Sequence, residues 1–450
     1  MLVPLMPFEE YMFLDGTASY PMNCFLRFAF SGRFDRLRFH RALERSLHWH
    51  PLLQARIIEM QKNRISWDLA GLPIPVCWQE NVARSDSLAG KPFDLFEEPP
   101  LRMTVRDYSD GGCDLILELH HSASDAMGVF LFMEHFFAAY HRDAEVVVDI
   151  HDAEHSAVLS SLRDRFRFAK SQWELLLGIR SQLFGFVRAW YFLVNRPESV
   201  VPYQPPQDRL SPPEGFPFLL ERQLSPQQST RLRDQCKRTG TSINDCLLTA
   251  AFQAIFSWRK SENITETGRY LRIAVPTDLR NEPAELSTAA NRVSMVFLDR
   301  KSPSADNSQK LLTGIHREMS HIKRHRLGWA FIFGLSLFKN VFGGFHGMIR
   351  QKRCWSSCVL TNLGRVFHRT ALPTSDGKIR LDGAEDGGTL ILERVSGSPP
   401  VRPWTVFGIN VVTYRKEVFL TLHYDPVAVS AEAAERFFDL FLNKLASIFE

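Results

Sequence analysis

The feature that most constrains this chain is an apolar stretch that ends in two histidines and an aspartate, within residues 114–128. Three leucines alternate with other residues before His120 and His121, and this alternation predicts a strand. After Asp125 the apolar residues follow a helical spacing. The sequence therefore predicts a strand, a short loop with the pattern HHxxxD and a buried helix, and loops of this kind can present reactive side chains.

A histidine in such a loop can be neutral near pH 7, accept a proton from a hydroxyl or an amine, and return it to a leaving group. His121 is therefore a candidate general base. Asp125, four residues later, can either reach back to the imidazole or pair with a distant arginine, and the sequence leaves both open. The pattern HHxxxD also occurs by chance and in structural roles, so its weight depends on the rest of the chain.

This context resembles the HXXXD-type acyltransferase superfamily, which includes chloramphenicol acetyltransferase, nonribosomal peptide synthetase condensation domains and wax ester synthases. The hallmark of that superfamily is HHxxxDG. The chain matches it from His120 to Asp125, but Ala126 stands in place of the glycine, and Gly128 follows two positions later. In the superfamily the second histidine is catalytic and the aspartate pairs with an arginine. The resemblance therefore implies a catalytic site of His121, Asp125 and His120.

The rest of the chain follows the order of motifs in the same superfamily. Residues 42–56 and 92–102 resemble its AL…HP-LR and PFDL…PLR segments, which are structural. Residues 270–280 resemble a VPVxLR segment, so Arg280 is the candidate partner of Asp125, and a solvated turn residue is the alternative. A buried pair of this kind would form a structural salt bridge that locks the motif loop.

Residues 359–366 resemble the TNLG segment that lines the far side of the channel in this superfamily. The Thr361 hydroxyl or the Asn362 amide could there bind substrate and donate to an oxyanion, and a simple turn after a strand is the alternative. Residues 291–298 match a GNxVS strand that lacks its glycine in this chain.

Length and composition fit a globular protein of two domains. The chain has 450 residues, of which 45% are hydrophobic and 23% charged. Seven prolines between positions 197 and 217 have the composition of a linker, so we expect an N-terminal lobe over residues 1–200 and a C-terminal lobe over 201–450. The formal charge of +4 is small for this length and argues against a general nucleic-acid binder.

Seven cysteines, an odd number, lack the spacing of zinc ligands, which indicates free thiols in a reducing compartment and no metal site. The N-terminus has no charged region followed by a long apolar run, so we expect a cytoplasmic protein. Residues 327–349 are apolar between basic flanks, but Lys339, Asn340 and five glycines argue against a membrane span. Core helices or a peripheral membrane contact fit this stretch better.

Residues 161–196 place seven basic side chains among phenylalanines, leucines and other apolar residues, which predicts a long helical region. One interpretation is a surface helix packed on the core. The other is an interfacial helix that contacts anionic lipid or acyl chains.

The resemblance implies an α/β (α+β) architecture of two chloramphenicol acetyltransferase-like lobes, each a mixed sheet with helices, that meet at a central channel. We expect His121 to deprotonate an alcohol or amine as it attacks a thioester, without an acyl-enzyme. The expected co-substrate is acyl-CoA, with a small-molecule acceptor and no bound cofactor. The alternatives are a free-standing condensation enzyme that takes its thioester from a carrier protein, and a non-catalytic binding relative.

Overall fold

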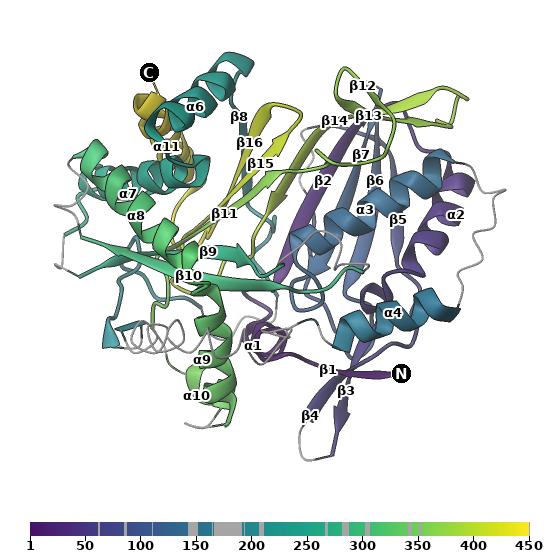
Figure 1. Ribbon diagram of the computed structural model, residues 1–450, viewed down its shortest axis with the longest axis horizontal. Helices are drawn as coiled ribbons and strands as arrows, with labels where there is room; N and C mark the ends of the chain where they lie inside the picture. Colours follow the sequence, from purple (N-terminus) through teal and green to yellow (C-terminus); the bar gives the residue numbers. More distant parts are fainter. Residues whose placement is uncertain are drawn as a thin grey trace.

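The structure is a computed structural model that describes residues 1–61, 64–84, 88–109, 111–142, 152–163, 165, 191–192, 194–206, 211–265, 269–280, 288–301, 307–340, 344–349, 351 and 353–449. Within these residues the strands form two large sheets and one small sheet. The two large sheets lie next to each other, and helices cover them on both sides of the molecule (Figure 1).

The first large sheet has seven strands, and β7 lies between β2 and β6. Its order is β12 (Thr374–Ser375), β13 (Lys378–Asp382), β14 (Thr389–Ser398), β2 (Asn23–Ser31), β7 (Cys113–His120), β6 (Leu101–Tyr108) and β5 (Val76–Val82). The helices α2 (Arg36–Leu47) and α3 (Ala126–His141) contact each other over this sheet (Figure 1). The alternating leucines of β7 and the phenylalanines of α3 share one buried core.

The second large sheet has six strands and is mixed, because β11 runs parallel to both of its neighbours while the other pairs are antiparallel. Its order is β10 (Val293–Arg300), β9 (Leu271–Asp278), β11 (Cys358–Arg365), β15 (Phe407–Tyr414), β16 (Glu417–Tyr424) and β8 (Leu219–Gln223). Its core also includes residues of α6 (Pro226–Thr239), α7 (Ile243–Ser261), α8 (Ser308–Arg324) and α11 (Ala431–Phe449).

The predicted α/β class with two mixed sheets and helices is confirmed. The first sheet also takes strands from the second half of the chain, because β14 pairs antiparallel with β2 through contacts such as Val395 opposite Phe28. Three strands from the second half of the sequence therefore complete the sheet that carries HHxxxD. The division into lobes of residues 1–200 and 201–450 stays a prediction, since β12, β13 and β14 follow residue 200 but belong to the first sheet.

Smaller elements complete the described part of the chain. A three-stranded sheet has the order β1 (Leu2–Pro4), β4 (Arg64–Asp68) and β3 (Arg56–Met60). The other helices within the described ranges are α1 (Pro7–Asp15), η1 (Pro51–Gln54), α4 (Asp152–Arg163), α9 (Gly328–Asn340) and α10 (Gly344–Ile349). In one apolar cluster α1 contacts α9 and α10, and Figure 1 shows these helices next to one another.

Most of the basic stretch predicted as a helix at 161–196 lies outside the described residues. Among the helices that are described, none combines the length and the apolar composition that a membrane crossing requires. The peripheral membrane contact and the cytoplasmic location stay predictions.

Candidate active site

The HHxxxD stretch has the predicted local structure of a strand, a loop and a helix. Strand β7 ends at His120, and the backbone N–H of His121 donates to the carbonyl of Met22 at 2.8 Å. Asp125 caps α3, because its carboxylate accepts a hydrogen bond of 2.9 Å from the backbone N–H of Gly128. The loop is thus fixed at both ends by a neighbouring strand and by a helix cap.

Asp125 pairs with Arg280 and does not reach back to the imidazole of His121. Two nitrogens of the Arg280 guanidinium lie 2.8 and 2.9 Å from the two carboxylate oxygens. The backbone N–H of Arg292 donates a third bond of 2.7 Å. Burial acts to raise the pKa of Asp125, but the Arg280 charge and these hydrogen bonds together hold it below its ordinary value. The carboxylate is therefore ionised and locked.

A second chain segment, residues 288–292, braces the motif loop from the other lobe. The side-chain amide of Asn291 donates to the carbonyl of His121 at 2.6 Å. The carbonyl of Ala290 accepts from Arg280 at 3.1 Å, and the backbone N–H of Ala289 donates to Nδ1 of the buried His50 at 2.7 Å. The sequence analysis did not identify Asn291 as a site residue. The match to GNxVS, which begins at Asn291, was the signal that could have pointed to it.

The position near this loop that has no room for a side chain is Gly128. A Cβ atom at Gly128 would lie 2.3 Å from the hydroxyl of Ser124 and 2.9 Å from the carbonyl of Ala290. Ala126 is instead the first residue of α3, where any residue with an ordinary helical backbone fits. The departure from HHxxxDG at Ala126 is therefore compatible with an intact loop.

His121 is arranged as a neutral base. Its Nδ1 lies 3.3 Å from the carbonyl oxygen of Ser124. A carbonyl can only accept, so Nδ1 carries the proton and Nε2 keeps its lone pair. Burial lowers the pKa of His121, and the nearby Asp125 charge offsets this only in part. The side chain is half-buried and lines a large cavity.

His120 has a different environment. It is buried, its Nδ1 lies 2.7 Å from the Ser122 hydroxyl, and the backbone N–H of Ser122 donates to the same atom at 3.3 Å. Its ring packs edge-on against Phe93, with centroids 6.1 Å apart. Burial lowers the pKa of His120 to about 3, with a smaller effect of His121. This histidine is not among the residues that line the cavity and holds the loop instead.

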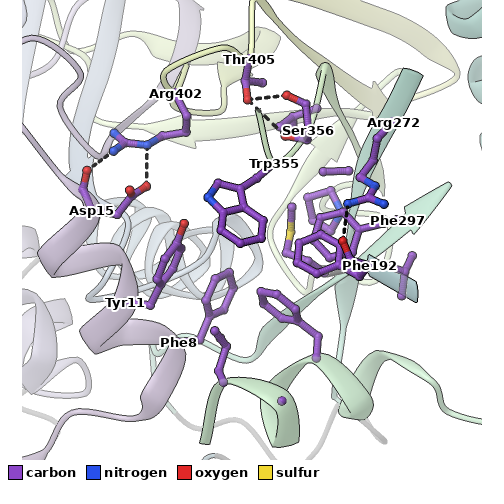
Figure 2. Close-up of a pocket in the computed structure, with 18 of the residues that line it drawn as sticks. Phe8, Tyr11, Asp15, Phe192, Arg272, Phe297, Trp355, Ser356, Arg402 and Thr405 are labelled. Carbon is purple, nitrogen blue, oxygen red and sulfur yellow. Dashed lines mark hydrogen bonds and ion pairs between the residues drawn. The ribbon is translucent and has the colours of Figure 1, made fainter. Parts of the chain in front are cut away.

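The cavity beside His121 has a volume of about 690 Å³. Figure 2 shows part of its wall, in which aromatic side chains from distant parts of the chain point toward one another. Its aromatic lining residues include Phe8, Tyr11, Phe192, Phe297, Phe331 and Trp355. The cavity wall thus combines residues of α1, β9, β10, α8, α9, α10 and β11 with the segments at 191–192, 351–356 and 399–405.

The acidic residues that line this cavity are paired with arginines. Asp15 pairs with Arg402 at 2.8 Å, as Figure 2 shows. Asp299 holds Arg272 through two bonds of 2.7 and 2.8 Å. Glu318, the third acid in the lining, lies 3.0 Å from an arginine of β10. The three acids in the wall are therefore paired. Arg353 is a fourth arginine in the lining, and most of the remaining lining residues are apolar.

The structure brings Thr361 to the cavity but not Asn362. The Thr361 hydroxyl is buried and has no hydrogen-bond partner among the described residues. The side-chain oxygen of Asn362 instead accepts from the backbone N–H of Gly364 at 3.0 Å, where the pairing of β11 with β15 is irregular. Gly364 has a φ of +67°, a conformation that favours glycine. Asn362 therefore shapes the strand rather than the cavity wall.

Comparisons with known proteins rest on structure, because no family model matches the sequence and no curated protein matches it significantly. One similar structure is the first condensation domain of the CDA synthetase, with 13% identity and a TM-score of 0.70, covering 100% of this chain and 96% of that one. The starter condensation domain of rhizomide synthetase RzmA, a mutant in complex with C8-CoA and Leu-SNAC, has 12% identity, a TM-score of 0.70 and coverages of 99% and 94%.

A third similar structure is the epimerization domain from the third module of tyrocidine synthetase B, with 16% identity and a TM-score of 0.66, covering 100% of this chain and 96% of that one. The predicted fold is confirmed by these full-length matches. The chain has the two-lobed fold of the condensation and epimerization domains of nonribosomal peptide synthetases, a form of the chloramphenicol acetyltransferase-like fold.

Proposed function

We propose that the protein transfers an apolar acyl group from a thioester to an amine or an alcohol. The observation that carries this proposal is the neutral imidazole of His121 at the wall of an apolar cavity that Thr361 also lines. A non-catalytic relative has no need of a histidine kept neutral beside an open cavity. The intact Asp125–Arg280 pair, which fixes the loop of this histidine, supports the same conclusion.

The proposed reaction is a direct attack. Nε2 of His121 accepts the proton of the acceptor while the nitrogen or oxygen of that acceptor forms a bond to the thioester carbonyl carbon. The Thr361 side chain lines the same cavity, and its buried hydroxyl, which has no partner among the described residues, turns toward the resulting oxyanion and donates to it. The carbon–sulfur bond then breaks, and the proton passes from His121 to the leaving thiolate. No acyl-enzyme forms, because the cavity holds both reactants together.

The chemistry of the cavity selects the acyl group. Its volume of about 690 Å³ lies within the range of sites that enclose drug-sized ligands. A wall of aromatic side chains with paired carboxylates favours a neutral apolar group, because burying an uncompensated charge there would be unfavourable. An acyl chain of about eight carbons fits this description, and one of the similar structures was determined with C8-CoA.

We propose that the thioester donor is acyl-CoA. A thioester on a carrier protein is the second candidate, because the similar structures include domains of nonribosomal peptide synthetases. Both donors present the same reacting bond and differ only in the group attached beyond the pantetheine arm. The core of the site is therefore common to the two.

The test is acceptor-dependent release of free thiol. Octanoyl-CoA, octanoyl-N-acetylcysteamine and an octanoyl carrier protein are each supplied with a pooled set of amines and alcohols, and products are identified by mass spectrometry. Transfer from CoA and from the short thioester supports the proposal. Transfer from the carrier protein alone assigns the second candidate, and consumption of none of the three contradicts acyl transfer.

A further inference from the structure

Helix α9 forms one wall of the cavity with a single face. Its lining residues recur at intervals of three and four, which places them on one side of the helix. They are Ala330, Phe331, Gly334, Leu335 and Phe338. The face is entirely apolar, and one of its central positions carries no side chain.

Among the residues that the structure describes, none requires a glycine at this position. A Cβ atom at Gly334 would meet none of the described atoms within 4 Å. Its φ is not in the positive range that favours glycine. Within a helix, glycine is less stable than alanine by about 0.5–1 kcal/mol. Gly128 is the opposite case, because a Cβ there would collide with the motif loop. Gly334 therefore keeps space in the cavity rather than permitting a close contact.

The surroundings of Gly334 are held in place by ring contacts. Phe331, on the preceding turn, packs perpendicular to Phe8 of α1 with centroids 5.2 Å apart, and lies 5.6 Å from Phe297 of β10. On another part of the wall Trp355 stacks on Phe192, with ring centroids 5.4 Å apart. The rings around Gly334 are thus packed against rings of other elements, and a rotation of Phe331 that filled the space would break its contacts with Phe8 and Phe297.

We propose that Gly334 is a specificity-determining residue, and that the far end of a bulky neutral acyl group, an alkyl chain of about eight carbons or an aryl group, lies over its backbone. This inference rests on the proposed function and adds the position that limits the size of the acyl group. A leucine side chain at 334 would project into the cavity and exclude the end of such a chain. A two-carbon acyl group would remain unaffected.

Gly314 provides a matched control. It lies within α8, a Cβ atom there also meets none of the described atoms within 4 Å, and it is not among the residues that line the cavity. Replacing either glycine by leucine increases helix propensity by a similar amount. Both variants should therefore fold, with melting temperatures at or above that of the wild type. They differ in position, because Gly334 lines the cavity, whereas Gly314 lies outside its lining, one helical turn before the lining residue Glu318.

Two measurements are made on the full chain with Gly334→Leu, Gly334→Ala and Gly314→Leu. The first is calorimetric binding of S-octyl-N-acetylcysteamine, a thioether that cannot transfer its chain. The second is the rate of acyl transfer from acetyl, butanoyl, octanoyl and benzoyl thioesters. We expect Gly334→Leu to weaken thioether binding at least tenfold and to shift the preference toward acetyl and butanoyl donors. Gly334→Ala should lie between Gly334→Leu and the wild type, and Gly314→Leu should stay within twofold of the wild type.

The outcomes separate this inference from the proposed function. If the wild type binds the thioether and Gly334→Leu does not, but no donor is transferred, the size-limiting role of Gly334 holds and acyl transfer is wrong. If the wild type transfers octanoyl groups and Gly334→Leu has the same chain-length profile as Gly314→Leu, acyl transfer holds and the role of Gly334 is overturned. Failure of the wild type both to bind and to transfer overturns both.

Discussion

Arg280 holds Asp125 through two hydrogen bonds of 2.8 and 2.9 Å, although the two residues lie 155 positions apart in the chain. Only 6% of the aspartate side chain and 9% of the arginine side chain are exposed. The pair joins the loop after β7 in one sheet to the end of β9 in the other. It therefore fixes the loop of His121 relative to the second lobe.

Removing Arg280 should be strongly destabilising. We expect Arg280→Ala to lower the free energy of unfolding by about 3–5 kcal/mol, because it leaves a buried carboxylate without its partner. Arg380→Ala is the control, since Arg380 pairs with Asp382 at the surface at 3.9 Å and should contribute less than about 1 kcal/mol. Urea denaturation measures both variants. Equal losses in the two would show that the Asp125–Arg280 pair does not lock the loop.

The close approach at Gly128 leads to a second prediction. Gly128→Ala places a methyl group against Ser124 and Ala290, so it should lower stability by about 1–3 kcal/mol through overpacking. Ala126→Gly, which restores the HHxxxDG pattern, should change stability by less than about 1 kcal/mol. Chemical denaturation of the two variants compares the positions directly. A larger loss for Ala126→Gly than for Gly128→Ala would contradict this account of the loop.

Replacing Thr361 should affect catalysis but not stability. Thr361→Val removes an oxygen that has no partner among the described residues, so the melting temperature should hardly change. If the hydroxyl donates to the oxyanion, kcat should fall by about 10²–10³-fold. Thr361→Ser should restore most of the rate. An unchanged kcat in Thr361→Val would remove this residue from the mechanism.

Buried histidines predict a loss of stability in acid. Burial lowers the pKa of His120 to about 3, and burial together with His135 lowers that of His50 well below its ordinary value. Below pH about 6.5 the unfolded chain binds protons that the native protein does not. The contribution of these histidines to the free energy of unfolding should therefore be fully present above this pH. It should decrease as the pH falls further, by up to about 1.4 kcal/mol per pH unit for each histidine.

Replacement of one histidine tests this linkage. Asparagine at position 50 keeps an acceptor for the backbone N–H of Ala289, which now donates to Nδ1 of His50 at 2.7 Å, but it does not titrate in this range. His50→Asn should flatten the dependence of the unfolding free energy on pH between about 6.5 and 4.5. An unaltered slope would show that His50 does not contribute to the acid sensitivity.

Local signals explain which parts of the site could be predicted from the sequence. The alternating leucines of β7 and the capping aspartate of α3 act over a few residues, so the strand, the loop and the helix could be located. Arg280 was reached only through a resemblance, because no local pattern links it to Asp125. The resemblance also suggested Asn362, which the structure places on a strand irregularity away from the cavity wall.

Other features depend on tertiary contacts that leave no local trace. The pairing of β14 with β2 joins residues that are more than 300 positions apart. The role of Gly128 depends on the close approach of Ala290, which lies just before β10 of the six-stranded sheet. Helix α1 lines the cavity with Phe8 and Tyr11 only because it packs against α9. Periodicity describes single elements and does not contain these relationships.

A comparison of His121 with its neighbour His120 tests most directly whether His121 is the base of the proposed acyl transfer. The rate of acceptor-dependent thiol release from octanoyl-CoA is measured for the wild type, His121→Ala and His120→Ala, with folding checked by circular dichroism. We predict that His121→Ala remains folded and loses at least about 10²-fold in rate. His120→Ala should act mainly on stability, because His120 is buried outside the cavity lining. A folded His121→Ala variant with the wild-type rate would contradict the account.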